Sequence, residues 1–177
     1  MTTKISMLEL VELNISHIPQ VVKLLKSTLP EEGFDDAEYL ISLLTSGGFG
    51  KVYIIREYIV GVILAIDYKS FIYIAVISVD PFYQNRGVGK TMLEEIIISS
   101  SKDIWIKINQ CNTASQSLFK KYNFTIKKKK DIPEPLKKSY RTKYYPYCRK
   151  YKEVYNLNNF DLYKEIIELQ DKIRRLY

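Results

Sequence analysis

The 177-residue sequence has few of the residues on which metal sites and disulfide frameworks depend. It contains two cysteines, Cys111 and Cys148, and a single histidine, His17. Two cysteines so far apart in the chain form neither a metal-ligand spacing nor a disulfide framework, so we expect free thiols in a reducing cytoplasm and no metal. A lone histidine near a predicted helix start is expected to be a surface or capping residue.

Long hydrophobic runs are also missing. The longest, such as residues 60–66, fall far short of the roughly 18 residues that a membrane span needs. The start of the chain, Met1 to Ile5, holds no apolar signal core. We therefore expect neither a membrane span nor secretion. With 46% hydrophobic and 27% charged residues, the composition is typical of a soluble globular protein, and the length fits one domain.

Acidic residues are scarce in one segment only. Residues 127–152 hold eleven Lys or Arg and two acidic residues, about +9, whereas the rest of the chain holds sixteen basic and eighteen acidic residues, about −2. Five tyrosines are interleaved with these basic residues. We call residues 127–152 the basic segment. Such a segment predicts either a solvated face or a surface for acidic partners or nucleic acid.

The most informative stretch is a predicted strand-to-helix turn with two glycines at the helix start. Residues 71–78 are apolar and β-branched, as in a strand, and apolar residues recur at helical spacing from Val88 to Ile97. The turn between them reads Val79-Asp80-Pro81-Phe82-Tyr83-Gln84-Asn85-Arg86-Gly87-Val88-Gly89-Lys90. Its backbone N–H groups would lie uncovered at the positive end of a helix dipole. The turn therefore predicts an anion site for a phosphate or pyrophosphate.

Two common nucleotide-binding patterns fail in this turn. A P-loop needs a glycine where Gln84 stands, and a dinucleotide fingerprint needs a third glycine where Met92 stands. The pattern Gln84-x-x-Gly87-x-Gly89 after Val79-Asp80-Pro81 instead resembles motif A of the GNAT superfamily of acetyl-CoA-dependent N-acetyltransferases. The alternative is a glycine-containing turn that binds no ligand.

Residues 112–124 resemble motif B of the same family, usually written N-x-x-A-x-x-L-Y-x-x-x-G-F. Asn112, Leu118 and Phe124 match this pattern, whereas Ser115, Phe119 and Asn123 replace Ala, Tyr and Gly. Asparagine is the best non-glycine residue for a left-handed helix end, so the last change is mild. The resemblance covers approximately residues 5–130 and is nearest to protein N-terminal acetyltransferases.

The resemblance implies the α/β GNAT fold, a mixed and mostly antiparallel sheet flanked by helices, over residues 1–155. Residue patterns predict strands at 5–13, 51–56, 59–66, 71–79, 104–109 and 144–151, and a turn at 47–50. Ser16 is predicted to cap the first helix, and Pro146 to confine the last strand to an edge or bulge. An added amphipathic helix is expected over 156–177, packing on the domain or forming a homodimer. In the family, the strands before the two motifs splay apart around the pantetheine arm.

The resemblance also assigns the cosubstrate, acetyl-CoA, to particular residues. Backbone N–H groups of the turn would bind its pyrophosphate, strand backbone would pair with pantetheine, and the Ile77 N–H would polarise the thioester carbonyl. Asn112 would contact pantetheine or cap its helix, and Phe119 occupies the place of the family's usual tyrosine proton donor. The predicted cofactor-binding residues are Ile77, Ser78, Val79, Gln84, Asn85, Arg86, Gly87, Val88, Gly89, Lys90, Asn112 and Phe119.

A catalytic base is less evident, because residues 72–79 contain no Asp, Glu or His. We predict Tyr73 as catalytic, since some N-terminal acetyltransferases carry a catalytic tyrosine there, and expect it to share a strand face with Ile77; plain packing is its alternative. Lys107, on the neighbouring strand, would need a strongly lowered pKa to accept a proton. Tyr122 is a weak substitute for the missing proton donor.

The acceptor is predicted from amine chemistry. An α-amine of pKa ~7.7–8.0 is roughly 10% neutral at pH 7, whereas a lysine amine at ~10.4 is about 0.04% neutral. A site without a strong base therefore favours a peptide or protein N-terminus, acidic if the basic segment lies nearby. Tyr144 and Tyr145 resemble the paired tyrosines over the peptide entrance of N-terminal acetyltransferases, and are predicted to bind substrate. The alternative function is a catalytically weak module of this fold that binds nucleic acid or acidic partners.

Overall fold

The computed structural model describes residues 9–29, 37–138 and 141–151. One seven-stranded sheet runs through them in the order β1-β2-β3-β4-β5-β7-β6. Neighbouring strands are antiparallel except for β4 and β5, which are parallel. This confirms the predicted mixed, mostly antiparallel sheet. The strands are β1 (Glu9–Glu12), β2 (Gly48–Ile55), β3 (Tyr58–Tyr68), β4 (Phe71–Val79), β5 (Asp103–Asn109), β6 (Thr125–Ile126) and β7 (Tyr144–Arg149).

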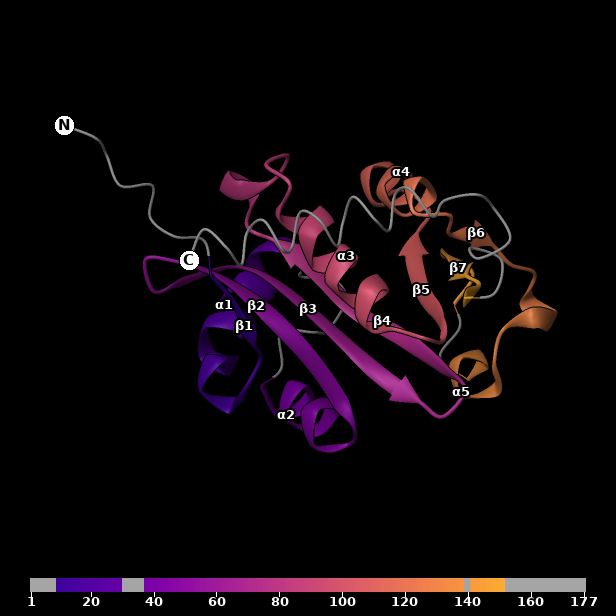
Figure 1. Cartoon of the computed structure of the whole chain (residues 1–177), viewed down its shortest axis with the longest axis horizontal. Coiled ribbons are helices and arrows are strands. Elements are labelled where there is room, and N and C mark those ends of the chain that lie inside the picture. The colour runs from indigo at the N-terminus through magenta and orange to yellow at the C-terminus, as the bar shows by residue number, and fades with distance from the viewer. Residues whose placement is uncertain (1–8, 30–36, 139–140, 152–177) are drawn as a thin grey trace.

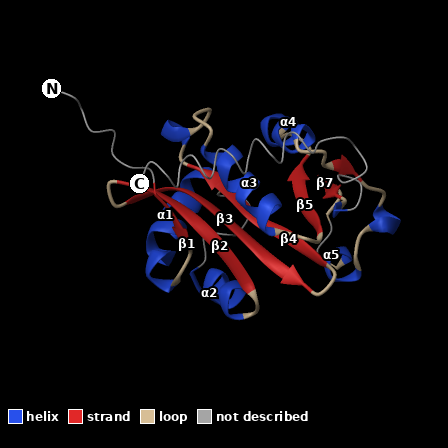
Figure 2. Ribbon diagram, viewed as in Figure 1, coloured by secondary structure: helices blue, strands red, loops and turns tan. Residues whose placement is uncertain are grey.

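Helices cover both faces of the sheet (Figures 1 and 2). Helices α1 (Ile18–Thr28) and α2 (Ala37–Thr45) pack on one face, and α3 (Val88–Ser99) and α4 (Thr113–Lys121) on the other. Strand β3 is buried from residue 59 to 65. Because successive strand residues point to opposite faces, Ile63 joins the core under α3, whereas Val62 joins the core under α1. The short helix α5 (Glu134–Lys137) covers a third, smaller core.

The start of α1 corrects one prediction and confirms another. The capping residue is Asn14, not Ser16: its Oδ1 accepts from the Ser16 N–H at 2.9 Å. The His17 Nδ1 accepts in return from the Asn14 N–H at 3.2 Å, so His17 is a capping residue, as predicted. A single turn of 3₁₀ helix (Ile15–His17) therefore precedes α1, which moves the cap two residues towards the N-terminus.

The turn predicted at residues 47–50 is wrong beyond Gly47, because Gly48 and Gly50 lie within β2. A Cβ atom on Gly48 would approach the Leu43 carbonyl oxygen to 2.3 Å, and one on Gly50 would approach that of Ile63 equally closely, at 2.3 Å. Gly48 therefore permits close packing against α2 and Gly50 against β3, rather than a change of chain direction.

The placement of Pro146 corrects the expectation of an edge strand, because β7 lies between β5 and β6. The Pro146 carbonyl accepts from the Lys127 N–H at 2.8 Å, on the side of β6. Since the N–H and C=O of one strand residue point the same way, the missing N–H of proline faces the point where β6 ends, at Ile126. The hydrogen bond that Pro146 cannot donate would therefore lie just past the end of β6.

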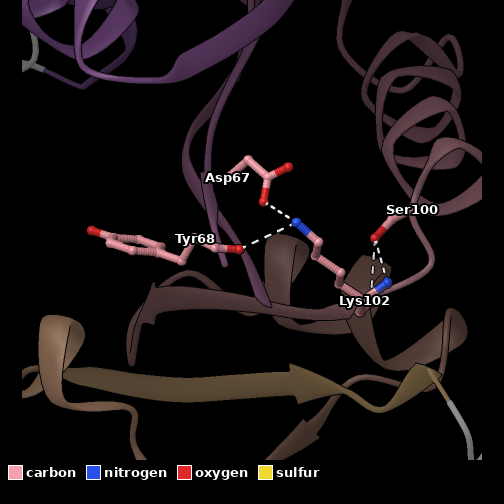
Figure 3. A network of polar contacts seen from close by, with 4 residues as sticks. All are labelled: Asp67, Tyr68, Ser100 and Lys102. Atoms are coloured by element: carbon pink, nitrogen blue, oxygen red, sulfur yellow. Dashed lines mark hydrogen bonds and ion pairs between the residues drawn. The ribbon is translucent and has the colours of Figure 1, made fainter. Parts of the chain in front are cut away.

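Strands β4 and β5 are joined at one end and open at the other. Their register pairs Phe71 with Asp103 and ends at Ile74 and Ile106. At the joined end, Lys102 Nζ contacts Asp67 Oδ1 at 2.5 Å and the Tyr68 carbonyl at 3.4 Å (Figure 3). In the same figure, the Lys102 N–H donates to Ser100 Oγ at 3.1 Å. The sheet thus opens between the two carboxyl ends, as the resemblance implies.

Some predictions fall outside the described residues. These are the amphipathic helix at 156–177, the homodimer through it, the boundary at residue 155 and the first part of the strand predicted at 5–13. Within the described ranges, each helix is too short or too polar to cross a bilayer.

Candidate active site

The turn between β4 and α3 is held in shape by its own side chains. Asp80 Oδ1 accepts from the Phe82 N–H at 2.8 Å, which starts a single 3₁₀ turn (Pro81–Tyr83). Gln84 Nε2 then donates to the Val79 carbonyl at 3.0 Å, tying the turn back to the end of β4. Two left-handed residues follow, Asn85 with φ 60° and Gly87 with φ 87°. They turn the chain directly into α3.

Gly87 leaves the start of α3 uncovered. A Cβ atom built on it would have no neighbour within 4 Å, so the glycine is required by its backbone angle and not by crowding. The first intrahelical bond of α3 runs from the Thr91 N–H to the Gly87 carbonyl at 2.9 Å. The N–H groups of residues 88–90 precede this bond, at the positive end of the helix dipole. They are donors for an anion.

The open edge of β4 adds further donors. The Asp80 N–H donates to the Val60 carbonyl of β3 at 2.8 Å. Because N–H groups alternate in direction along a strand, those of Ile77 and Val79 face away from β3, into the gap between β4 and β5. An extended amide chain in this gap would therefore meet strand-like hydrogen-bonding groups.

Two cavities meet in this gap. The larger, about 430 Å³, lies against the β4–α3 turn, and the smaller, about 90 Å³, lies between β4, β5 and β7. Both are lined by Leu29, Ile77, Asn112, Ser115 and Phe119, so they adjoin at the opening of the sheet, and we call the two together the passage. Strand β7 reaches the smaller cavity through Tyr144, whereas the start of α3 borders only the larger one.

Of the twelve predicted cofactor-binding residues, all but Arg86 line the larger cavity: Ile77, Ser78, Val79, Gln84, Asn85, Gly87, Val88, Gly89, Lys90, Asn112 and Phe119. The exposed Arg86 guanidinium instead lies over the rings of Phe82 and Tyr83, at 4.8 and 5.7 Å. A contribution of Arg86 to this cavity would therefore come from its backbone. Ser78 is fixed through its hydroxyl, which bonds to Thr28 Oγ1 at 2.6 Å and links β4 to the end of α1.

Helix α4 forms the far wall of the passage. Asn112 caps it, with Oδ1 accepting from the Ser115 N–H at 3.0 Å. Gln116 Nε2 donates to the Gln110 carbonyl at 2.8 Å and its Oε1 accepts from Tyr147 Oη at 3.2 Å, which fixes α4 against β5 and β7. This anchoring sets the position of Phe119, one turn further along the helix.

The proton-donor position of the family holds no hydroxyl here. Phe119 is fully buried and packs edge-on against Phe124, with ring centroids 5.0 Å apart. Tyr122 does not replace it, because its hydroxyl donates to Glu94 Oε1 at 2.7 Å and its side chain lines neither cavity. Burial and the Glu94 carboxylate raise the pKa of Tyr122 above its ordinary value. Tyr122 therefore joins α4 to α3.

A β-bulge changes the surroundings predicted for Tyr73. The β3–β4 register shifts so that Leu64 pairs with Val76 and Ala65 with Ile74, which leaves Ala75 as an extra residue. The shift separates Tyr73 from Ile77: Tyr73 packs with Phe71 and Trp105 in the third core, and Ile77 packs against the core under α3. The shared face predicted for Tyr73 and Ile77 is therefore wrong.

The two tyrosines at the start of β7 also lie on opposite faces. Tyr144 lines the smaller cavity. Tyr145 packs against the core under α3. Adjacent strand residues point to opposite sides of a sheet, so the two rings do not act as a pair. Only Tyr144 has the position expected of an acceptor-binding residue.

Lys107 lines the smaller cavity and lies over the Tyr73 ring, with Nζ 5.3 Å from the centroid. Burial, and then the positive charge of Arg141, lower the pKa of Lys107. Sequence patterns place Lys107 on a strand but do not show this burial, which comes from distant segments. Thr28 and Leu29 carry no sequence signal for the site either, whereas Ser115 could have been found one helical turn before Phe119.

Uncovered helix-start donors beside two splayed strands form the arrangement of a coenzyme A-dependent acyltransferase. The sequence profile of the acetyltransferase (GNAT) family matches residues 18–124, and the chain belongs to this family. It is therefore an acyltransferase whose cosubstrate is acetyl-CoA. No curated protein sequence matches this chain.

Solved structures of this fold resemble the chain closely in three dimensions. A GNAT-family acetyltransferase from Staphylococcus aureus is 20% identical, with a TM-score of 0.68 over 82% of this chain and 99% of the other. The ribosomal-protein-S18-alanine N-acetyltransferase of Escherichia coli is 16% identical, with 0.64 over 80% and 91%. The PaiA N-acetyltransferase of Thermoplasma acidophilum, in complex with coenzyme A, is 15% identical, with 0.66 over 82% and 99%. These likenesses confirm the predicted GNAT fold.

Proposed function

We propose that this acetyltransferase acts on the α-amine of a peptide or protein N-terminus. The observation that carries the proposal is the lining of the two cavities, which among the described residues includes no Asp, Glu or His. An α-amine is already roughly 10% neutral at pH 7, whereas a lysine amine is about 0.04% neutral and depends far more on a strong base. A site lined in this way therefore suits an α-ammonium group, which has the lower pKa, better than a lysine ammonium group.

In this proposal, acetyl-CoA binds at one end of the passage and the acceptor at the other. At the larger cavity, the N–H groups of residues 88–90 would hold the pyrophosphate. Along the open edge of β4, the N–H of Val79 would pair with pantetheine, and that of Ile77 would stabilise the developing oxyanion. Acetyl-CoA supplies the activated acyl group. The acceptor would enter at the smaller cavity, past Leu29 and Tyr144.

Charge at the acceptor side favours acidic acceptors. Arg141 is close enough to Lys107, in the lining of the smaller cavity, for its positive charge to lower the pKa of that lysine. Lys143 Nζ lies 5.1 Å from the ring centroid of Tyr144, at the same end of β7. Positive potential here would attract a peptide with acidic residues behind its N-terminus. One neighbour in fold is itself named for acetylating an alanine of a ribosomal protein.

The basic segment contributes to the fold as well as to surface charge. Lys150 pairs with Asp103 at 2.6 Å and Lys137 with Glu134 at 2.7 Å. Arg149 is buried and donates through Nε to the Tyr122 carbonyl at 3.1 Å. Part of the charge is thus engaged within the protein, and we do not assign the segment to nucleic acid. A cytoplasmic location stays a prediction, in keeping with two free cysteines.

A peptide panel tests the proposed acceptor. Peptides with a free N-terminus and no lysine are compared with N-terminally blocked peptides that carry one lysine, each with acidic or basic neighbours. Mass spectrometry locates the acetyl group. We expect N-terminal acetylation to exceed lysine acetylation by at least about tenfold, and acidic peptides to lose their advantage in high salt. Acetylation confined to lysine side chains would contradict the proposal.

A further inference from the structure

We propose that Lys107 is the proton acceptor of acetyl transfer and that the Tyr73 ring positions it. The inference requires acetyl transfer to an amine but not the choice of a peptide N-terminus. The acceptor still enters as a neutral amine, but its nitrogen must lose a proton once it has attacked the thioester, and the cavity lining includes no carboxylate or imidazole among the described residues to accept that proton.

The position of Lys107 in the sheet is the first argument. The β4–β5 ladder ends at Ile106, and Lys107 is the next residue, at the point where the two strands separate. Its side chain lines the smaller cavity together with Ile77, whose N–H faces the gap, and with Tyr144. The Lys107 side chain therefore borders the same cavity as Ile77, whose N–H would hold the thioester carbonyl.

The other titratable groups of the described lining are less well placed. Tyr83 and Lys90 line only the larger cavity, at the turn that would hold the pyrophosphate. Tyr144 lines the smaller cavity, but its side chain is a phenol and carries no basic nitrogen. Lys107 is the amine at the acceptor end.

The charges around Lys107 favour its neutral form. Tyr73 faces it from β4, Tyr144 from β7 and Arg141 from the chain before β7. Burial and the Arg141 charge lower its pKa. The Tyr73 ring acts the other way, because an aromatic face attracts an ammonium group. The ring fixes where Nζ lies, and the net shift of the Lys107 pKa is towards the neutral amine.

The proposed step balances in atoms and electrons. The lone pair of the neutral amine forms the new N–C bond to the thioester carbon, the C–S bond breaks and the sulfur leaves as a thiolate. Lys107 Nζ takes one proton from the amine nitrogen and becomes an ammonium. It then gives that proton to the thiolate, so that the products are the N-acetylated amine and the free thiol. No oxidant, reductant or further reactant is needed.

Three substitutions of Lys107 separate a base from a bound cation. Lys107→Met removes the amine, Lys107→Arg keeps a charge that does not deprotonate, and Lys107→His restores a base of pKa ~6.5. We expect the first two variants to lower kcat by about 100-fold or more, and the histidine variant to recover at least about tenfold of that loss. Its rise in activity with pH should begin at lower pH than in the wild type. Lys51→Met, outside both cavities, is the control.

Two other results for Lys107 would overturn the inference. In the first, Lys107→Arg is fully active, and Lys107→Met differs from the wild type only by a raised KM for acidic acceptors. Lys107 would then be a cation that binds the acceptor. Acetyl on Lys107 after turnover would make it a nucleophile. Unchanged acetyl-CoA binding and melting temperature would show that the variants fold. The assays use whichever amine is acetylated best, peptide or small molecule, so failure of the N-terminal preference contradicts the proposed acceptor alone. Transfer to no amine would overturn both proposals.

Discussion

Phe119 lies where α4 meets both cavities, in the place of the family's usual tyrosine proton donor. The ring is fully buried against Phe124. A thiol of pKa about 8.5 is a tolerable leaving group without a proton donor. Loss of the phenol would therefore slow the departure of the thiolate without abolishing transfer, and Lys107 would return the proton afterwards.

Phe119→Tyr tests this account of the leaving group. The added hydroxyl would enter the passage, and we expect kcat to rise by up to about tenfold, below the usual range for a well-placed general acid. Steady-state kinetics measures the rise, and calorimetry checks that acetyl-CoA affinity is retained. An unchanged kcat with unchanged affinity would show that protonation of the thiolate does not limit turnover.

Tyr73 is tested by separating its ring from its hydroxyl. If the ring positions Lys107, Tyr73→Phe should keep activity within about twofold, whereas Tyr73→Ala should lower kcat by more than about tenfold. Both variants are assayed with the same acceptor at saturating acetyl-CoA. A large loss in Tyr73→Phe would instead assign the catalytic role to the hydroxyl, as the sequence alone suggests.

Among the elements, α4 depends on the capping residue that precedes it. Asn112 satisfies the Ser115 N–H with its side chain and also lines both cavities. We expect Asn112→Ala to lower the free energy of unfolding by about 1 kcal/mol, the usual value of an N-cap. Asn112→Asp, which caps equally well, is the control. Urea denaturation measures both, and equal stability of the alanine and aspartate variants would refute the capping role.

Strand β4 shows why spacing alone misplaces a side chain. Tyr73 and Ile77 are four residues apart, so an uninterrupted strand would put them on one face. The extra residue, Ala75, reverses the alternation between them. No sequence pattern marks this bulge, because it is set by the register of β3. The case of Tyr144 and Tyr145 is different from that of Tyr73. Strand alternation by itself predicts that these two neighbours face opposite sides of the sheet.

At the scale of the whole molecule, sequence reasoning succeeds where signals are local. The β4–α3 turn is built from consecutive residues, and the glycine at position 87 has the left-handed angle that its place in the motif requires. The features that sequence reasoning misses depend on segments far apart in the chain. Thr28 is bonded to Ser78 of β4, and the pKa of Lys107 is lowered partly by the charge of Arg141, in the chain before β7. Such contacts appear only after folding.

In the proposed function, the opening in the sheet would give the two substrates separate entrances. Acetyl-CoA would approach from the α3 side, where the larger cavity lies, and the acceptor from the β7 side, at the smaller one. The acyl carbon would meet the amine where β4 and β5 diverge. This layout permits direct attack while both substrates are bound, and it needs no acyl-enzyme intermediate.

Acetyl-CoA binding by Gly87→Glu tests the central claim most directly. Gly47 offers a matched control, because its φ of 90° resembles the 87° of Gly87 and neither position has a neighbour within 4 Å of a built Cβ atom. Both glutamates would take a left-handed φ of similar size, but only the one at position 87 places a carboxylate at the predicted pyrophosphate site. We predict calorimetric binding on the order of micromolar in the wild type and Gly47→Glu, and none in Gly87→Glu. Equal binding in all three proteins would contradict the claim that this turn holds acetyl-CoA.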